Sequence, residues 1–368
     1  MKRIILSGKS GFIGNNIFNE LIRLGHSITN VDLRKSIDEI KKEYTNKSFD
    51  IFIHAAGVHP YRDELNEKSV FKKSKELLKK IEPIFSKSKK IILISSFVNL
   101  INYDNEIITE TNKIYSTKND NFYKKSKVLT ERYFKLLKRK FKNELIIIYP
   151  CHVIGPNDFK KSPNGDFLIK NFKRVLSFYT NINYPITDVR EISNYIIFSI
   201  NNELNSSSKI LIDRNLYLLE YFKLLKSHRK KIKFILKVDI RFYYFAHLFF
   251  KVIQRLLNLQ KNPYPISTYY YLKLNPKVVP QIDNNYNIKY KLEKTILDTV
   301  KFFELWYIMS FMNIVRDTFF DKGFISPIKA LDVSTATEIK NKYVNFYENI
   351  SSTREKVEHK SKSHLLFN

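Results

Sequence analysis

Tyr123 and Lys127 are the residues whose types and spacing most directly suggest chemistry. Side chains four residues apart on a helix lie on one face, so both can point at the same site. A tyrosine hydroxyl ordinarily ionises only near pH 10, and a neighbouring ammonium group stabilises the phenolate that proton transfer requires. The pair is therefore a candidate for moving a proton to or from an alcohol oxygen while a hydride moves at the carbon.

A serine hydroxyl is expected beside this pair. The apolar run at residues 91–94 ends in Ser95-Ser96, where a buried strand would reach the edge of a sheet. A hydroxyl at this place can donate a hydrogen bond to the same substrate oxygen that the tyrosine protonates. We expect Ser96 to do this, with Ser95 as the alternative.

A glycine-rich turn near the start of the chain indicates a dinucleotide site. The turn follows the apolar run at 4–6 and opens the helical stretch at 14–25. Its first glycine permits a tight turn, its second lets the backbone approach a pyrophosphate, and its third allows close helix packing. The helix N-terminus adds N–H donors and the positive end of its dipole. The expected contacts are Gly8, Ser10, Gly11, Phe12, Ile13 and Gly14.

Two further apolar runs end in residues that suit the same ligand. Asp32 is placed to accept hydrogen bonds from the adenosine ribose, which favours NAD. Arg34 can accommodate the 2′-phosphate of NADP, so NADP stays open. The run at 51–53 leads to His54, which we expect to be a packed structural residue. Small residues that let the cofactor lie against the backbone follow it: Ala55, Ala56 and Gly57.

The order of apolar runs and helical stretches predicts the fold that positions these residues. Through the first 150 residues, continuous apolar runs alternate with polar, helix-like stretches, a pattern typical of a parallel sheet covered on both faces. With right-handed crossovers this is an α/β fold with a Rossmann-type doubly wound sheet. We expect the NAD(P)-binding domain at residues 1–160, with segments around 185–215 returning to it. A smaller, mostly helical substrate-binding domain is expected at 161–322, and a partly flexible extension at 323–368.

Taken in order, these motifs resemble those of the extended short-chain dehydrogenase/reductase family, also described as the NAD-dependent epimerase/dehydratase group. The resemblance covers residues 1–200 and runs through the turn at 8–14, Asp32, His54-Ala55-Ala56, Ser95-Ser96, Tyr123 with Lys127, and Pro150 with Gly155-Pro156. It implies a catalytic set of Ser96, Tyr123 and Lys127, of which the tyrosine and the lysine also contact the cofactor. It further implies that Pro150, His152 and Val153 border the nicotinamide. Glu110 and Glu131 fall where the family often has a glutamate, and we expect both to be structural.

Three functions follow from these observations. The segment at 188–192 and the aromatic helices after it are similar to those of dihydroflavonol reductases and 3β-hydroxysteroid dehydrogenases, which favours an NAD(P)-dependent oxidoreductase of secondary alcohols or ketones. The alternative is a nucleotide-sugar epimerase, dehydratase or reductase in surface polysaccharide synthesis, where Lys173 and Arg174 could bind the diphosphate. The third is a non-catalytic dinucleotide-binding or basic surface-binding protein, against which the presence of both Tyr123 and Lys127 argues. Both enzyme functions imply a small-molecule substrate.

The composition bears on compartment and partners. The formal net charge is +28, but its lysines are spread along the chain without an arginine–aromatic recognition module, which argues against nucleic acid. The single cysteine, Cys151, fits a reducing compartment, so we expect a cytoplasmic protein. The apolar stretches at 242–250 and 302–315 fall short of a membrane span and are expected to be buried or amphipathic helices. Lys230-Lys231, beside the aromatic run at 234–250, leaves peripheral contact with the inner membrane surface open. A homodimer is open as well.

Overall fold

The computed structural model describes residues 2–58, 66–118, 120–202, 204, 207–228, 234–257, 266–281 and 286–319. The chain divides into two compact units, Met1–Leu305 and Trp306–Asn368. The first unit contains every described strand and the beginning of the last helix, α10 (Leu292–Phe319). The described part of the second unit is the remainder of that helix. All site residues predicted from the sequence lie within the first unit.

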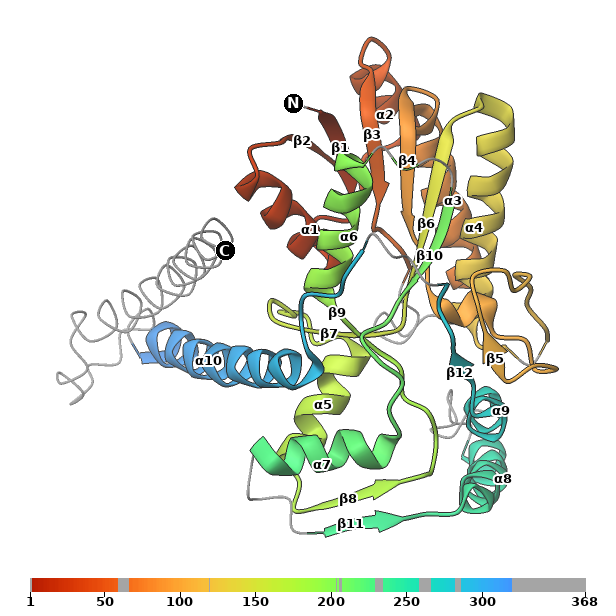
Figure 1. The fold of residues 1–368 in the computed structure, drawn as a ribbon, viewed down its shortest axis with the longest axis vertical. Coiled ribbons are helices and arrows are strands. Elements are labelled where there is room, and N and C mark those ends of the chain that lie inside the picture. Colours follow the sequence, from red (N-terminus) through yellow and green to blue (C-terminus); the bar gives the residue numbers. More distant parts are fainter. Residues whose placement is uncertain are drawn as a thin grey trace, which may run out of the picture. The chain divides into compact units, whose positions relative to one another are not determined.

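A six-stranded parallel sheet forms the centre of the first unit (Figure 1). Its order is β2-β1-β3-β4-β6-β10, in which the strands are β1 (Arg3–Ser7), β2 (Ser27–Val31), β3 (Phe49–His54), β4 (Ser88–Ile94), β6 (Glu144–Pro150) and β10 (Ser207–Leu211). From β1 the chain moves to β2 on one side and then to β3 on the other. Sheets of this kind bind ligands where the strand order reverses, here at the carboxyl ends of β1 and β3.

Helices cover both faces of this sheet. On one face, Ile5 and Phe52 pack in a buried cluster with α2 (Ile37–Tyr44), α3 (Glu67–Phe85) and α4 (Phe122–Phe141). On the other face, Ile4 and Leu6 pack with α1 (Phe12–Arg23) and α6 (Val189–Asn201). Because neighbouring strand residues point to opposite faces and both faces are buried, the strands are continuous apolar runs. The predicted Rossmann-type α/β fold is confirmed.

Segments that alternate in the sequence with the last strands of the sheet form a smaller α/β region. Its helices are α5 (Pro163–Lys173), α7 (Leu218–His228), α8 (Ile240–Leu256) and α9 (Ile266–Leu274). Short parallel strands pair as β7 (His152–Ile154) with β9 (Ile186–Asp188), β8 (Leu176–Tyr179) with β11 (Phe234–Lys237), and β5 (Ile107–Ile108) with β12 (Lys277–Val278). The region thus contains strands as well as helices.

The domain boundaries stay predictions, and residues 323–368 lie outside the described ranges. In the described part of the chain, no helix has the length and apolarity needed to cross a membrane.

Candidate active site

The glycine turn packs its backbone directly against the end of β3. Gly8 has a φ of +89°, a conformation that favours glycine, and a Cβ atom there would lie 2.5 Å from the backbone nitrogen of Ala56. A Cβ atom at Gly14 would overlap the carbonyl oxygen of Gly8. The N–H of Gly11 donates to that same oxygen at 2.9 Å. Only glycine fits at positions 8 and 14, so the turn brings α1, β1 and β3 into direct backbone contact.

The first turn of α1 is open to an anion. Its N-cap residue, Gly11, makes no side-chain capping bond, and the first turn carries no acidic residue. The backbone N–H groups and the positive end of the helix dipole therefore suit a phosphate group. Ser10 is exposed, whereas Phe12 and Ile13 pack partly against the apolar cluster beneath α1. These residues fit the pyrophosphate of a dinucleotide, and their contacts with it stay a prediction.

Arg34 folds back onto Asp32 after the end of β2. Its Nε and Nη2 atoms donate to the two carboxylate oxygens, each at 2.8 Å. These hydrogen bonds lower the pKa of Asp32 to about 2, so the carboxylate is ionised at neutral pH. The arginine side chain is 91% exposed, and such surface ion pairs open at little cost. The arrangement therefore leaves both groups available, the carboxylate for a ribose and the guanidinium for a 2′-phosphate.

The lysines of the motif at 123–127 point in different directions from α4. Lys124 turns inward, where its buried Nζ pairs with Asp120 at 3.1 Å. Lys125 pairs with Glu67 of α3 at 2.9 Å. Together these contacts anchor the first turn of α4 to its neighbours, and the third lysine extends toward the sheet.

Lys127 reaches the ends of β3 and β4. Its Nζ donates to the carbonyl oxygen of Ile94, the last residue of β4, at 3.3 Å. A Cβ atom at Gly57, just after β3, would lie 3.5 Å from the same Nζ. The Nζ also lies 5.9 Å from the centre of the Tyr123 ring. The structure therefore brings Tyr123 and Lys127 together at the sheet edge that the glycine turn occupies.

The two serines after β4 have different surroundings although both are buried. Ser95 Oγ donates to Glu131 at 2.9 Å and accepts from Asn99 at 3.0 Å. Glu131 also accepts from the hydroxyl of Tyr149 at 2.6 Å, so this buried network ties β4, α4 and β6 together. Ser96 makes no side-chain capping bond at the 3-10 turn η1 (Phe97–Leu100) that it precedes. Among the described residues its hydroxyl has no hydrogen-bond partner, which leaves it available to a ligand.

His152 lies in an aromatic cluster assembled from distant parts of the chain. Its ring stacks on Tyr184 with centroids 4.4 Å apart, and Phe97 meets it edge-on at 5.3 Å. Its Nε2 lies 3.4 Å from the hydroxyl of Tyr271. Burial lowers the pKa of His152 to about 4, so the ring is neutral at pH 7. No local sequence pattern distinguishes these three aromatic partners among the 29 Phe and 23 Tyr of the chain, so they could not be predicted.

The other residues around the nicotinamide segment are mainly packed inside. Pro150 ends β6, and Val153 is buried in the cluster between the sheet and α6. His54 is buried, with its Nδ1 2.7 Å from Ser7 Oγ. Burial, reinforced by the charge of Lys127, lowers the pKa of His54 to about 3. His54 is thus a neutral packed residue, and the cofactor contacts of Pro150 and Val153 stay predictions.

Acidic residues elsewhere hold segments in place. Glu110 accepts backbone N–H groups from β10 and from the segment after β12, at 2.9 and 2.8 Å. Arg190 pairs with Asp188 and Asp298, each at 2.6 Å, and so joins α6 to the beginning of α10. Glu191 accepts two backbone N–H groups from the segment that leads into α10. The 188–191 segment is therefore a structural anchor.

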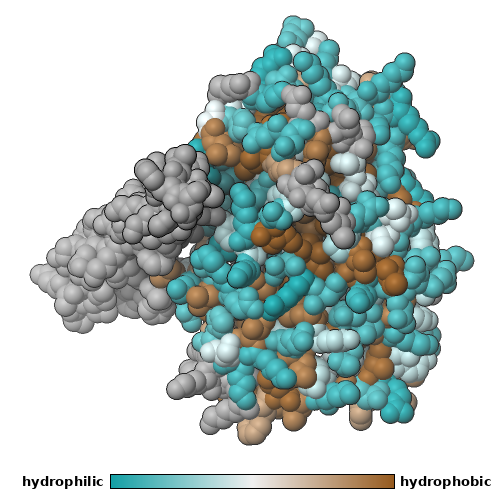
Figure 2. All heavy atoms as spheres, viewed as in Figure 1, coloured by the Kyte–Doolittle hydropathy of each residue, from teal (hydrophilic) through white to brown (hydrophobic). Residues whose placement is uncertain are grey.

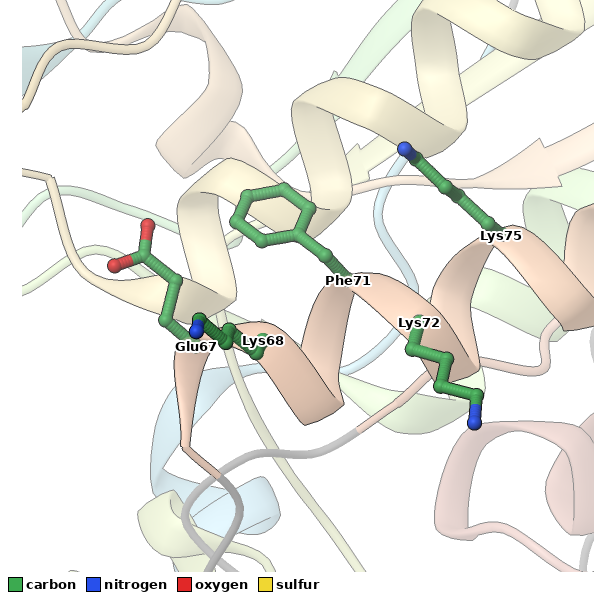
Figure 3. Close-up of a pocket in the computed structure, with 5 residues that line it drawn as sticks. All are labelled: Glu67, Lys68, Phe71, Lys72 and Lys75. Carbon is green, nitrogen blue, oxygen red and sulfur yellow. The ribbon is translucent and has the colours of Figure 1, made fainter.

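A separate hollow lies on the outer surface of α3. It is lined by Glu67, Lys68, Phe71, Lys72 and Lys75, all from the same helix (Figure 3). None of the site residues predicted from the sequence lines it. The hollow is therefore outside the candidate active site, which is built at the carboxyl ends of the strands.

Comparison with known proteins agrees with this geometry. The profile of the NAD dependent epimerase/dehydratase family matches residues 4–179. No curated protein matches the chain in sequence. Among solved structures, the chain is similar to UDP-glucose 4-epimerase with UDP-glucose from Thermotoga maritima, with 16% identity and a TM-score of 0.60 over 82% of this chain and 98% of that one.

Two further structures bind different forms of the cofactor. WbmG of Bordetella bronchiseptica, in complex with NAD, is 11% identical, with a TM-score of 0.59 over 83% of this chain and 94% of that one. RMD of Pseudomonas aeruginosa, complexed with NADPH, is 12% identical, with a TM-score of 0.58 over 82% of this chain and 100% of that one. At these identities the likeness shows the fold. The profile match assigns residues 4–179 to the NAD-dependent epimerase/dehydratase family of enzymes.

Proposed function

We propose that this protein is an NAD(P)-dependent epimerase, dehydratase or reductase of a nucleotide-activated sugar. One observation carries the proposal: Lys127 Nζ contacts the end of β4 through the carbonyl of Ile94, and it lies where a side chain on Gly57 would meet it. This lysine joins the proton-transfer residues of α4 to the edge where the glycine turn would hold the cofactor. Two halves of a hydride-transfer site then share one edge of the sheet.

Each residue of the proposed set has a defined task. The hydroxyl of Ser96 donates a hydrogen bond to the substrate oxygen. Tyr123 takes the proton from that oxygen when the alcohol is oxidised and returns it when the carbonyl is reduced. The ammonium of Lys127 stabilises the phenolate form of Tyr123, which is present before the proton is taken and again after it is returned. The nicotinamide, when bound, accepts or supplies the hydride at the carbon.

NAD is the cofactor that we propose first. Asp32 is ionised and directly follows β2, the strand beside β1, so it can accept hydrogen bonds from ribose hydroxyls and would repel a 2′-phosphate. Arg34 keeps NADP as the alternative, because its exposed guanidinium can leave Asp32 and meet a phosphate.

The sugar-nucleotide substrate class is favoured over the apolar ketone that the sequence first suggested. The UDP-glucose 4-epimerase of Thermotoga maritima covers most of this chain with the same fold. Lys173 and Arg174 are exposed at the C-terminal end of α5, where they could meet a diphosphate. One observation supports a second candidate, reduction of an apolar ketone: His152, which is expected to border the nicotinamide, is packed among aromatic rings, so its surroundings are largely apolar.

The two candidates are separated by substrate assays on the full chain. Purified protein is incubated with NAD and UDP- or GDP-linked hexoses, and the sugar products are resolved by NMR. Conversion of a nucleotide sugar by the wild type, and its loss in Tyr123→Phe, is the expected result. Reduction of apolar ketones with NAD(P)H, without conversion of any nucleotide sugar, would instead favour the second candidate.

A further inference from the structure

Helix α8 exposes an apolar stripe that the rest of the described chain leaves uncovered. Phe242, Phe245, Phe249, Val252 and Leu256 are between 57% and 78% exposed, and α8 contains no buried residue. Their spacing of three and four residues confines them to an arc of about 80° on a helix with 100° per residue. The helix contacts the protein mainly through α9, for instance where Tyr244 meets Tyr269. The stripe is thus a continuous apolar face that points away from the protein.

A basic stripe runs beside the apolar one. Arg241, Lys251 and Arg255 are exposed on the adjoining arc of α8. Within residues 234–257 the single acidic residue is Asp239, which caps the helix and pairs with Arg241. The exposed face of α8 is therefore apolar on one side and cationic on the other, the pattern of helices that lie in a membrane interface.

The ribbon that leads into α8 carries a second exposed apolar set. In the β8–β11 pairing, Phe234 lies opposite Leu176 and Leu236 lies opposite Phe178, and all four side chains are exposed. The ribbon and α8 lie at the end of the first unit away from the six-stranded sheet (Figure 1). Hydrophobic residues gather over the edge that β8 and β11 form (Figure 2). The lysines at 230–231, which first suggested a membrane contact, lie outside the described residues.

We propose that α8, together with the β8–β11 ribbon, docks this protein onto an anionic lipid surface. The spacing of the stripe would also suit a coiled coil with a second copy. Charge argues against that partner, because a second α8 would bring its own Lys251 and Arg255, and residues 240–256 contain no acidic residue to pair with them. An anionic bilayer accepts both stripes at once, burying the phenylalanines below the headgroups and pairing the cations with phosphates.

The test uses the full chain and vesicles of phosphatidylcholine with or without phosphatidylglycerol. Co-sedimentation should show binding to the anionic vesicles and little to the neutral ones. Phe245→Ser with Phe249→Ser should lower the partition coefficient by about tenfold or more, since two aromatic side chains leave the interface. Lys251→Glu with Arg255→Glu should lower it by a similar factor.

Matched controls keep the proposal falsifiable. Lys42→Glu with Lys79→Glu removes the same amount of positive charge from exposed sites on α2 and α3, and Leu136→Ser removes an exposed apolar side chain from α4. Both should leave binding within about twofold, because the interface is local. Circular dichroism checks that every variant is folded. Equal losses in the controls, or no binding by the wild type, overturn the proposal. A wild-type dimer that Phe245→Ser with Phe249→Ser converts to a monomer would assign the stripe to a second copy instead.

Discussion

Replacing Ser95 and Ser96 by alanine, one at a time, should separate stability from catalysis. Ser95 Oγ hydrogen-bonds the buried carboxylate of Glu131 and the amide of Asn99. Losing a hydrogen bond to a buried charged group costs about 1.5–3 kcal/mol. In a unit that spans Met1–Leu305, this corresponds to a fall in Tm of roughly 2–5 °C. Ser95→Ala should therefore be less stable and keep most of its turnover.

Ser96→Ala should behave in the opposite way. Its hydroxyl has no hydrogen-bond partner among the described residues, so stability should change by less than about 0.5 kcal/mol. Loss of a donor to the reacting oxygen should lower kcat by about 10²-fold. The assays are differential scanning calorimetry and steady-state kinetics on the substrate that the wild type converts. If Ser95→Ala abolished turnover at unchanged Tm while Ser96→Ala remained active, the assignment of the two serines would be reversed.

Four other perturbations probe the cofactor edge and the buried interior. Tyr123→Phe should retain NADH binding, measured by fluorescence titration, but lose about 10²-fold or more in turnover; undiminished turnover would contradict the proton-transfer role. Gly14→Ala places a Cβ against a backbone oxygen of the glycine turn, so calorimetric titration should show loss of dinucleotide binding. Unchanged affinity would contradict the prediction that this turn binds the pyrophosphate. Asp32→Ala should weaken NAD more than NADP, whereas the reverse ranking would mean that Arg34 sets the preference. The pKa of His54 falls from 6.5 to about 3 on folding. Between these two pH values the unfolded chain binds a proton at His54 and the folded chain does not. The free energy of unfolding should therefore decrease as the pH falls below 6.5. His54→Asn should reduce that drop in thermal denaturation scans at a series of pH values, and an unchanged pH dependence would refute it.

The features that the sequence determined by itself are those set by local geometry. A positive φ at Gly8 and a backbone contact at Gly14 are demands of one tight turn, and glycine is the residue that meets them. The four-residue spacing of Tyr123 and Lys127 likewise follows from helix geometry alone. Continuous apolar strands indicated a sheet covered on both faces, because burial on both sides removes the polar alternation.

Tertiary structure decided whatever depends on residues that are distant in the sequence. Ser95 and Ser96 are adjacent and both buried, and it is Glu131, brought in by α4, that engages Ser95 and leaves Ser96 to a ligand. The aromatic walls around His152 come from three separate segments, so no local pattern could assemble them. The apolar stretch at 242–250 was expected to be either buried or amphipathic, and only the packing of α8 against α9 shows that Phe242, Phe245 and Phe249 face outward. A sequence pattern depends on residues that are neighbours along the chain. A side chain's burial and its hydrogen-bond partners depend on which distant segments pack against it.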